Sequence, residues 1–73
     1  MNRYEVALYN QDVREAYADG RKHPNYGPEW GDLRYLEVEA ETEEEALKLI
    51  RKHHPERQGF IIRDVILIKE FVE

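Results

Sequence analysis

The chain contains no cysteine and no serine, and its one threonine, Thr42, is assigned below to a helix cap. Without cysteine there are no disulfides, no thiol catalysis, no iron–sulfur clusters and no cysteine-ligated zinc. Without serine, tyrosine is the remaining hydroxyl nucleophile. Catalysis would therefore depend on histidine, lysine or carboxylates, and a 73-residue domain offers little volume for a pocket. We expect a protein that is not an enzyme.

Long apolar runs are also lacking, and the longest uninterrupted one extends from Val65 to Ile68. A membrane-spanning helix needs about 20 apolar residues, so we expect no membrane segment. The residues after Met1 continue directly into polar alternation without the apolar core of a secretion signal, which predicts a cytoplasmic protein. The length fits a single small domain over 1–73, of marginal stability because such a chain buries a small share of its surface.

Three segments have the apolar periodicity of β-strands. They are residues 3–9, residues 33–41 and a third segment that begins at Phe60. Arg63 and Asp64 interrupt the third segment, which predicts a bulge or a change of register at that point. This third strand is apolar on both faces, with Phe60, Ile62, Ile66 and Ile68 on one face and Ile61, Val65, Leu67 and Phe71 on the other.

Residues 43–53 are predicted to form the main helix. Thr42 is a suitable N-cap, and Glu45 three residues later completes a capping box. Pro55 cannot continue a helix and restricts the residue before it, so the helix should end near His53.

The connector between the first two strands, residues 10–32, is long for a domain of this size. Asp12 with Glu15 has the pattern of a capping box for a short helix that ends at Gly20. Residues 21–31 show no periodicity and contain two prolines, two glycines and the chain's tryptophan. We expect a short helix followed by an aromatic loop.

Together these elements predict an α+β fold with a three-stranded β-sheet in the order 2-1-3 and one main helix packed on one face. The first strand should lie in the centre, antiparallel to both neighbours. The run Glu-Val-Glu-Ala-Glu-Thr-Glu-Glu-Glu-Ala-Leu at 37–47 resembles a strand-to-helix junction of several unrelated small α+β modules, among them an archaeal ribosomal protein and the small subunit of phenylacetyl-CoA oxygenases. The resemblance covers this junction and implies no function.

The connector is the most distinctive feature, and we expect a small non-enzymatic binding or accessory module that acts through it and an exposed sheet face. Tyrosine, tryptophan and arginine are enriched at interaction hot spots, so the expected partner is another protein. A compatible interpretation is that Tyr26 and Trp30 cover the second face of the third strand. The candidate binding residues are Tyr17, Arg21, Lys22, His23, Tyr26, Glu29 and Trp30.

Nucleic-acid binding is an alternative function. The net charge of −5 disfavours it, because affinity for nucleic acid depends on neutralising phosphates with lysine and arginine. A local cluster of basic residues at the end of the main helix nevertheless has the required charge, and its members are Lys48, Arg51, Lys52 and Arg57.

A histidine-dependent metal or catalytic site is the other alternative. His53 should pack half-buried in the apolar stripe of the main helix and hydrogen-bond the last carbonyls. His54 and His23 lack the i,i+4 spacing of helical metal-binding pairs. The glutamates of 37–45 lack a glycine-containing loop to wrap a cation. We therefore expect no cofactor and no metal.

The third strand also bears on assembly. If the connector covers its second face, the chain is a monomer in which Trp30 is shielded. If the connector swings free, the exposed apolar residues of that face favour a symmetric dimer. We expect the monomer, with a weak homodimer as the alternative.

Overall fold

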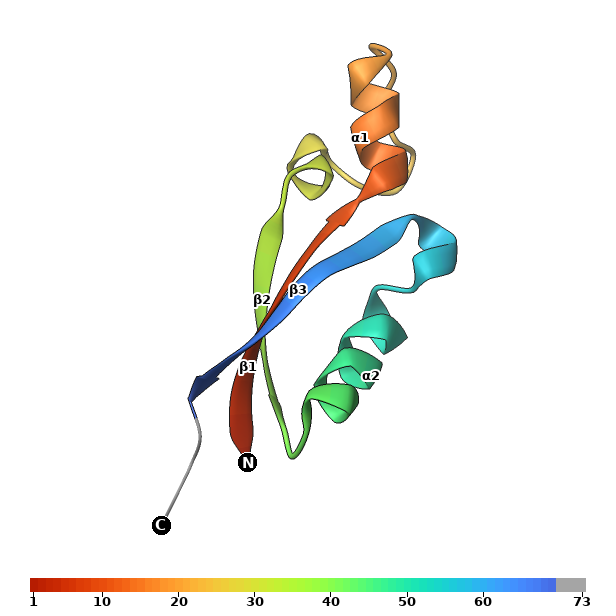
Figure 1. The fold of residues 1–73 in the computed structure, drawn as a ribbon. Helices are drawn as coiled ribbons and strands as arrows, with labels where there is room; N and C mark the ends of the chain where they lie inside the picture. Colours follow the sequence, from red (N-terminus) through yellow and green to blue (C-terminus); the bar gives the residue numbers. More distant parts are fainter. Residues whose placement is uncertain (70–73) are drawn as a thin grey trace.

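The computed structural model describes residues 1–69, which form three strands, two α-helices and two 3₁₀ helices. The strands form one sheet in the order β2-β1-β3, with β1 antiparallel to both neighbours, which confirms the predicted α+β fold (Figure 1). In chain order the elements are β1 (Asn2–Asn10), α1 (Gln11–Ala18), the 3₁₀ helix η1 (Pro28–Gly31), β2 (Arg34–Ala40), α2 (Glu43–His53), the 3₁₀ helix η2 (Glu56–Gln58) and β3 (Phe60–Lys69).

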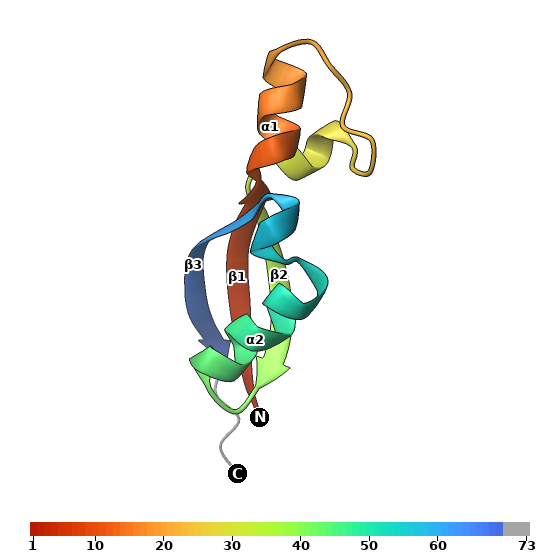
Figure 2. The same ribbon diagram turned by 90° about the vertical axis from the view of Figure 1, so that its right-hand side faces the viewer.

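One face of the sheet packs against α2 and forms the core (Figure 2). Tyr4, Val6 and Leu8 of β1 are buried at alternate positions, as the periodicity predicts. From α2 come Ala46 and Ile50, which lie four residues apart and therefore on the same side of the helix. In β2, exposed side chains alternate with covered ones, so this strand has one solvated face.

β3 carries the predicted bulge, and the position of the bulge corrects the predicted faces. In the pairing with β1, Ala7 lies opposite Asp64 and Leu8 opposite Ile62, so Arg63 is the extra residue. An extra residue moves the side chains that follow it to the other face of the strand. A second shift occurs at Ile68, because Leu67 lies opposite Tyr4 and Lys69 opposite Arg3. The α2 side of β3 is therefore formed by Phe60, Ile62, Val65 and Leu67, and the opposite side by Ile61, Asp64 and Ile66. Phe71, which the sequence places on the second face, lies outside the described residues.

α2 begins and ends where the sequence predicts. The hydroxyl of Thr42 accepts the backbone N–H of Glu45 at 3.1 Å. His54, which precedes the proline, is no longer in helical geometry, because its φ is −133° and its ψ is 66°. Gly59 has φ +97°, a left-handed conformation that favours glycine, and it turns the chain into β3.

We expect Thr42→Ala to lower the free energy of unfolding by about 1 kcal/mol, because the N–H of Glu45 loses its side-chain acceptor. Thr42→Ser keeps the hydroxyl group and serves as the control, with little expected change. Urea denaturation of the three proteins measures both effects. An equal loss of stability in the two variants would show that the hydroxyl does not hold the start of α2.

α1 is present as predicted, but its N-cap is Asn10 and not Asp12. The side-chain carbonyl of Asn10 accepts the N–H of Val13 at 3.0 Å. Because Asn10 is also the last residue of β1, the strand passes into the helix without a loop. The helix ends at Ala18 with Asp19 as its C-cap, and the predicted glycine, Gly20, follows with φ +74°.

The described chain is elongated. Its radius of gyration is 13.9 Å, whereas a globular chain of this length has about 11 Å. α1 and η1 extend beyond one end of the sheet (Figure 1). Within residues 1–69, the outer edges of both β2 and β3 have no neighbouring strand.

Candidate protein-binding groove

An aromatic cluster at the end of α2 holds the connector in place. The rings of Tyr26 and Trp30 meet the ring of Phe60 edge-on, at centroid distances of 5.2 and 5.6 Å. His54 lies 5.0 Å from Phe60 and 5.5 Å from Trp30. Each aromatic pair contributes about 0.5–1.5 kcal/mol beyond its buried area. The cluster thus ties the connector to α2 and β3.

Tyr26 and Trp30 cover a different surface from the one predicted. Phe60 lies on the α2 side of β3, and both aromatic side chains pack against the core cluster that contains it. The hypothesis that they shield the second face of the third strand is therefore wrong. The C-terminal part of β3 stays open, with Ile66, Leu67 and Ile68 exposed by 45%, 48% and 45%.

Of the predicted connector residues, the structure brings three together. His23 lies beside Tyr26, with ring centroids 5.4 Å apart, and Tyr26 lies 6.0 Å from Trp30. Arg21 and Lys22 are exposed and line a depression beside α1 together with His23, but Tyr26 and Trp30 do not line it. Tyr17 is half-buried on α1, and Glu29 is exposed.

Polar contacts also fix the connector. The Arg14 side-chain Nε donates to the carbonyl of Gly31 at 2.9 Å, which joins α1 to η1. A side chain on Gly31 would approach the Cα of Arg14 to 3.2 Å, so this close packing favours glycine. The hydroxyl of Tyr26 donates to the side-chain oxygen of Gln58 at 3.0 Å. The connector is therefore a packed structure and not a free arm.

A groove of about 410 Å³ lies between β2 and the C-terminal half of α2. Its apolar lining comes from Leu36 and Val38 of β2 and from Leu49 and Ile50 of α2. Glu37 also lines it, although its side chain belongs to the opposite face of the sheet, which places the groove at the outer edge of β2. Leu49 is exposed by 39%, so the groove presents apolar surface to solvent.

Trp30 stands at one end of this groove. It contacts His54, which lines the groove, and the guanidinium carbon of Arg34 lies 4.6 Å from its ring centroid. Arg34 Nε is buried and has no hydrogen-bond partner within the described part of the chain, so the ring face of Trp30 is its electrostatic contact. The groove thus meets the connector at this tryptophan.

The half-buried histidine at the end of α2 is His54, whereas the sequence predicts His53. His53 is exposed, whereas His54 is half-buried with its Nδ1 3.3 Å from the carbonyl oxygen of Ile50. A helical projection places His53 on the apolar stripe, but the chain leaves helical geometry at the next residue and the ring of His54 folds back over the last turn. In residues 1–69, no three histidine, aspartate or glutamate side chains group as metal ligands.

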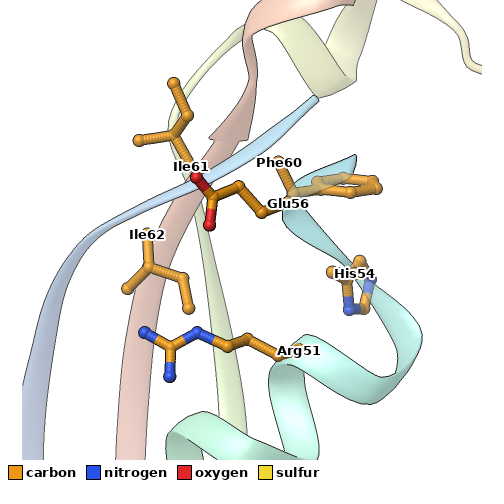
Figure 3. Close-up of a pocket in the computed structure, with 6 residues that line it drawn as sticks. All are labelled: Arg51, His54, Glu56, Phe60, Ile61 and Ile62. Carbon is orange, nitrogen blue, oxygen red and sulfur yellow. The ribbon is translucent and has the colours of Figure 1, made fainter. Parts of the chain in front are cut away.

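The predicted basic residues are divided between two places. Arg51 lines a hollow of about 200 Å³ beside Ile62 of β3 (Figure 3). Arg57 lines another depression with His23 and Tyr26. Lys48 and Lys52 are exposed on α2. These side chains do not line a common pocket.

The sequence analysis does not identify the groove as a site. Two signals indicate it in retrospect. The order 2-1-3 makes the second strand an edge strand, and Leu49 lies at the margin of the apolar stripe of the helix. An apolar side chain at such a margin, beside an open strand edge, is available to a partner.

Comparisons with family models, with curated proteins and with solved structures gave no match to this chain. The short resemblance at 37–47 therefore carries no argument about function. Among residues 1–69, no helix is long and apolar enough to cross a membrane.

Proposed function

We propose that the chain is a non-enzymatic protein-binding module that takes an extended segment of a partner protein into the groove between β2 and α2. The observation that supports this proposal is a largely apolar groove beside a strand edge that has no neighbour within residues 1–69. A segment that adds to such an edge gains main-chain hydrogen bonds, and its alternate side chains enter the adjacent pocket.

The charges of β2 favour a partner segment with cationic side chains. On the face away from α2, Glu37 lies directly opposite Glu5 of β1, so two carboxylates are adjacent. Like charges in directly opposite positions destabilise a sheet, and a cation beside them relieves the repulsion. Glu39, in contrast, already pairs with Arg3 at 3.3 Å. We therefore expect a partner segment in which apolar residues face the groove and lysine or arginine alternates with them beside Glu37.

The connector contributes the end of the binding surface. Trp30 is half-buried and adjoins the groove through His54. Tryptophan supplies a large, stiff contact area and is among the residues most enriched at binding hot spots. In this proposal the connector contacts the partner segment through Trp30, and the polar residues of the connector do not contact it.

The test uses a synthetic peptide of nine residues in which valine and lysine alternate, added to ¹⁵N-labelled protein. We expect amide chemical-shift changes in β2 and in the C-terminal half of α2. A peptide with glutamate in place of every lysine is the control, and it should bind more weakly because it meets Glu37. If neither peptide changes the amide chemical shifts, the proposal is contradicted.

Leu49→Glu should weaken binding of the valine–lysine peptide roughly tenfold or more. Burying a leucine side chain contributes about 1.5–3 kcal/mol, and each 1.4 kcal/mol is a factor of ten in affinity. Leu33→Glu is the matched control, because Leu33 is exposed by 42% and does not line the groove. Equal affinities of the two variants would place the binding surface elsewhere.

A mixed-sequence RNA oligonucleotide, titrated at two salt concentrations, tests the alternative function. Binding that weakens steeply with salt and maps to Lys48, Arg51, Lys52 and Arg57 would replace the peptide-binding proposal.

A further inference from the structure

The outer edge of β3 is a second open surface. Ile66, Leu67 and Ile68 follow one another in the chain and are each nearly half exposed, at 45%, 48% and 45%. Long apolar edge strands associate with other strands unless they are covered, charged or twisted away by a bulge. In β3 the bulge and the two charged residues lie at Arg63 and Asp64, and the exposed apolar residues follow them. The connector does not cover this part of β3, because Tyr26 and Trp30 pack on Phe60.

Residues 60–67 of β3 are complementary to themselves when read in the opposite direction. Arg63 and Asp64 carry opposite charges at the midpoint, and the three residues on either side of this pair are apolar, while Ile68 and Lys69 lie outside the complementary segment. Two antiparallel β3 strands related by a two-fold axis at this midpoint would therefore pair each charged residue with a residue of the opposite charge. Each apolar residue would pair with another apolar residue. The pairs would be Arg63 with Asp64, Ile62 with Val65, Ile61 with Ile66, and Phe60 with Leu67.

We propose that two copies of this chain associate through the outer edges of β3 in this register, which gives a continuous six-stranded sheet. Directly opposite residues in a sheet lie on the same face. The observed pairing with β1 meets this condition, since Ile62 and Val65 are on the α2 side and Ile61 and Ile66 on the other. Arg63 and Asp64 are exposed, and each would face the opposite charge of the second copy, so the axis carries two ion pairs.

A hollow beside β3 fits the same pairing (Figure 3). It measures about 200 Å³, and its lining combines three apolar side chains, Phe60, Ile61 and Ile62, with Arg51, His54 and Glu56. In the proposed register, Leu67 of the second copy lies opposite Phe60 and therefore beside the apolar part of this hollow. The pairing thus covers part of the exposed surface of each Leu67.

The edge of β2 does not offer an equivalent contact to a second copy. Its solvated face carries Glu37 and Glu39, and antiparallel pairing of two β2 strands would bring these carboxylates together. Self-association is therefore assigned to β3, and the proposal does not depend on peptide binding at β2.

Sedimentation equilibrium of four proteins tests the pairing: wild type, Arg63→Asp, Asp64→Arg and the double variant. We expect the wild type to be a dimer. In each single variant the dissociation constant of the dimer should rise roughly tenfold or more, because like charges meet at the axis. In the double variant it should return towards the wild-type value. Leu49→Glu, in the groove on the other edge, should leave the dimer unchanged. Circular dichroism verifies that each variant is folded.

Three results would overturn the proposal. They are a wild-type protein that is monomeric at every concentration reached, single variants that dimerise as strongly as wild type, and a double variant as weak as the single ones. If charge reversal unfolds a variant, Ile66→Glu is the substitute. It changes an exposed side chain at the proposed contact and should give a folded monomer.

Discussion

Phe60→Ala is expected to lower the free energy of unfolding by about 3–5 kcal/mol, because it removes a buried aromatic side chain at the junction of the sheet, α2 and the connector. Phe60 is 3% exposed and meets the rings of Tyr26, Trp30 and His54. The loss is a large share of the about 5–15 kcal/mol that stabilises a typical protein. Urea denaturation gives the change in stability, and quenching of tryptophan fluorescence reports whether Trp30 becomes accessible.

Two variants make this result interpretable. Phe60→Leu keeps most of the apolar volume and should cost less, which provides a folded protein if the alanine variant does not fold. Tyr35→Ala removes an aromatic side chain that is 57% exposed, and its expected cost is about 0.5 kcal/mol or less. A similar cost at Phe60 and Tyr35, with Trp30 equally shielded throughout, would show that the aromatic cluster does not anchor the connector.

Asn10→Ala should cost about 2–4 kcal/mol, because one buried side chain joins three elements. Asn10 is fully buried, its carbonyl oxygen accepts the N–H of Val13 at 3.0 Å, and its amide donates to the carbonyl of Gln58 at 3.0 Å. The substitution leaves both backbone groups without these partners. Thermal and urea unfolding measure the loss.

Asn10→Asp separates the two bonds. The carboxylate still accepts the N–H of Val13 but cannot donate to Gln58, so this variant should keep α1 capped while losing the tie to η2. A stability equal to wild type in Asn10→Ala would contradict the role assigned to this residue.

The boundaries of α2 were predictable because the signals that set them are local. The order of the strands was predictable for another reason. Thr42 with Glu45 marks the helix start, Pro55 its end and Gly59 the turn that follows, and each acts within a few residues of its own position. The strand order follows instead from the crossover of β2, α2 and β3, which makes β2 and β3 parallel and leaves room for β1 between them, antiparallel to both.

Two features were not predictable in the same way. They are the face of β3 on which the side chains after the bulge lie and the surface on which the connector packs. The bulge was expected at Arg63 and Asp64, but its effect on the later residues depends on how β3 pairs with β1, which is a contact between distant segments. Tyr26 and Trp30 pack on Phe60 because that residue lies on the α2 side, at the end of the helix.

The candidate site was predictable only in part, because it combines residues from separate elements. Aromatic residues of the connector were expected to matter, and Trp30 does adjoin the groove. The groove itself requires the open edge of β2 to lie beside Leu49 of α2, and a sequence read segment by segment does not show this. His54 was missed at the end of α2 because its ring direction depends on backbone angles after the last helical turn.

The central claim is that the two edges of the sheet are separate surfaces, with β2 taking a partner segment and β3 a second copy. The most direct test is a titration of the ¹⁵N-labelled wild-type protein with the valine–lysine peptide, in which amide shifts and the sedimentation coefficient are followed together. We predict shifts in Arg34–Ala40 and in the second half of α2, while the protein stays dimeric. Shifts centred on residues 60–68, with dissociation into monomers as the peptide binds, would contradict the assignment of the two edges.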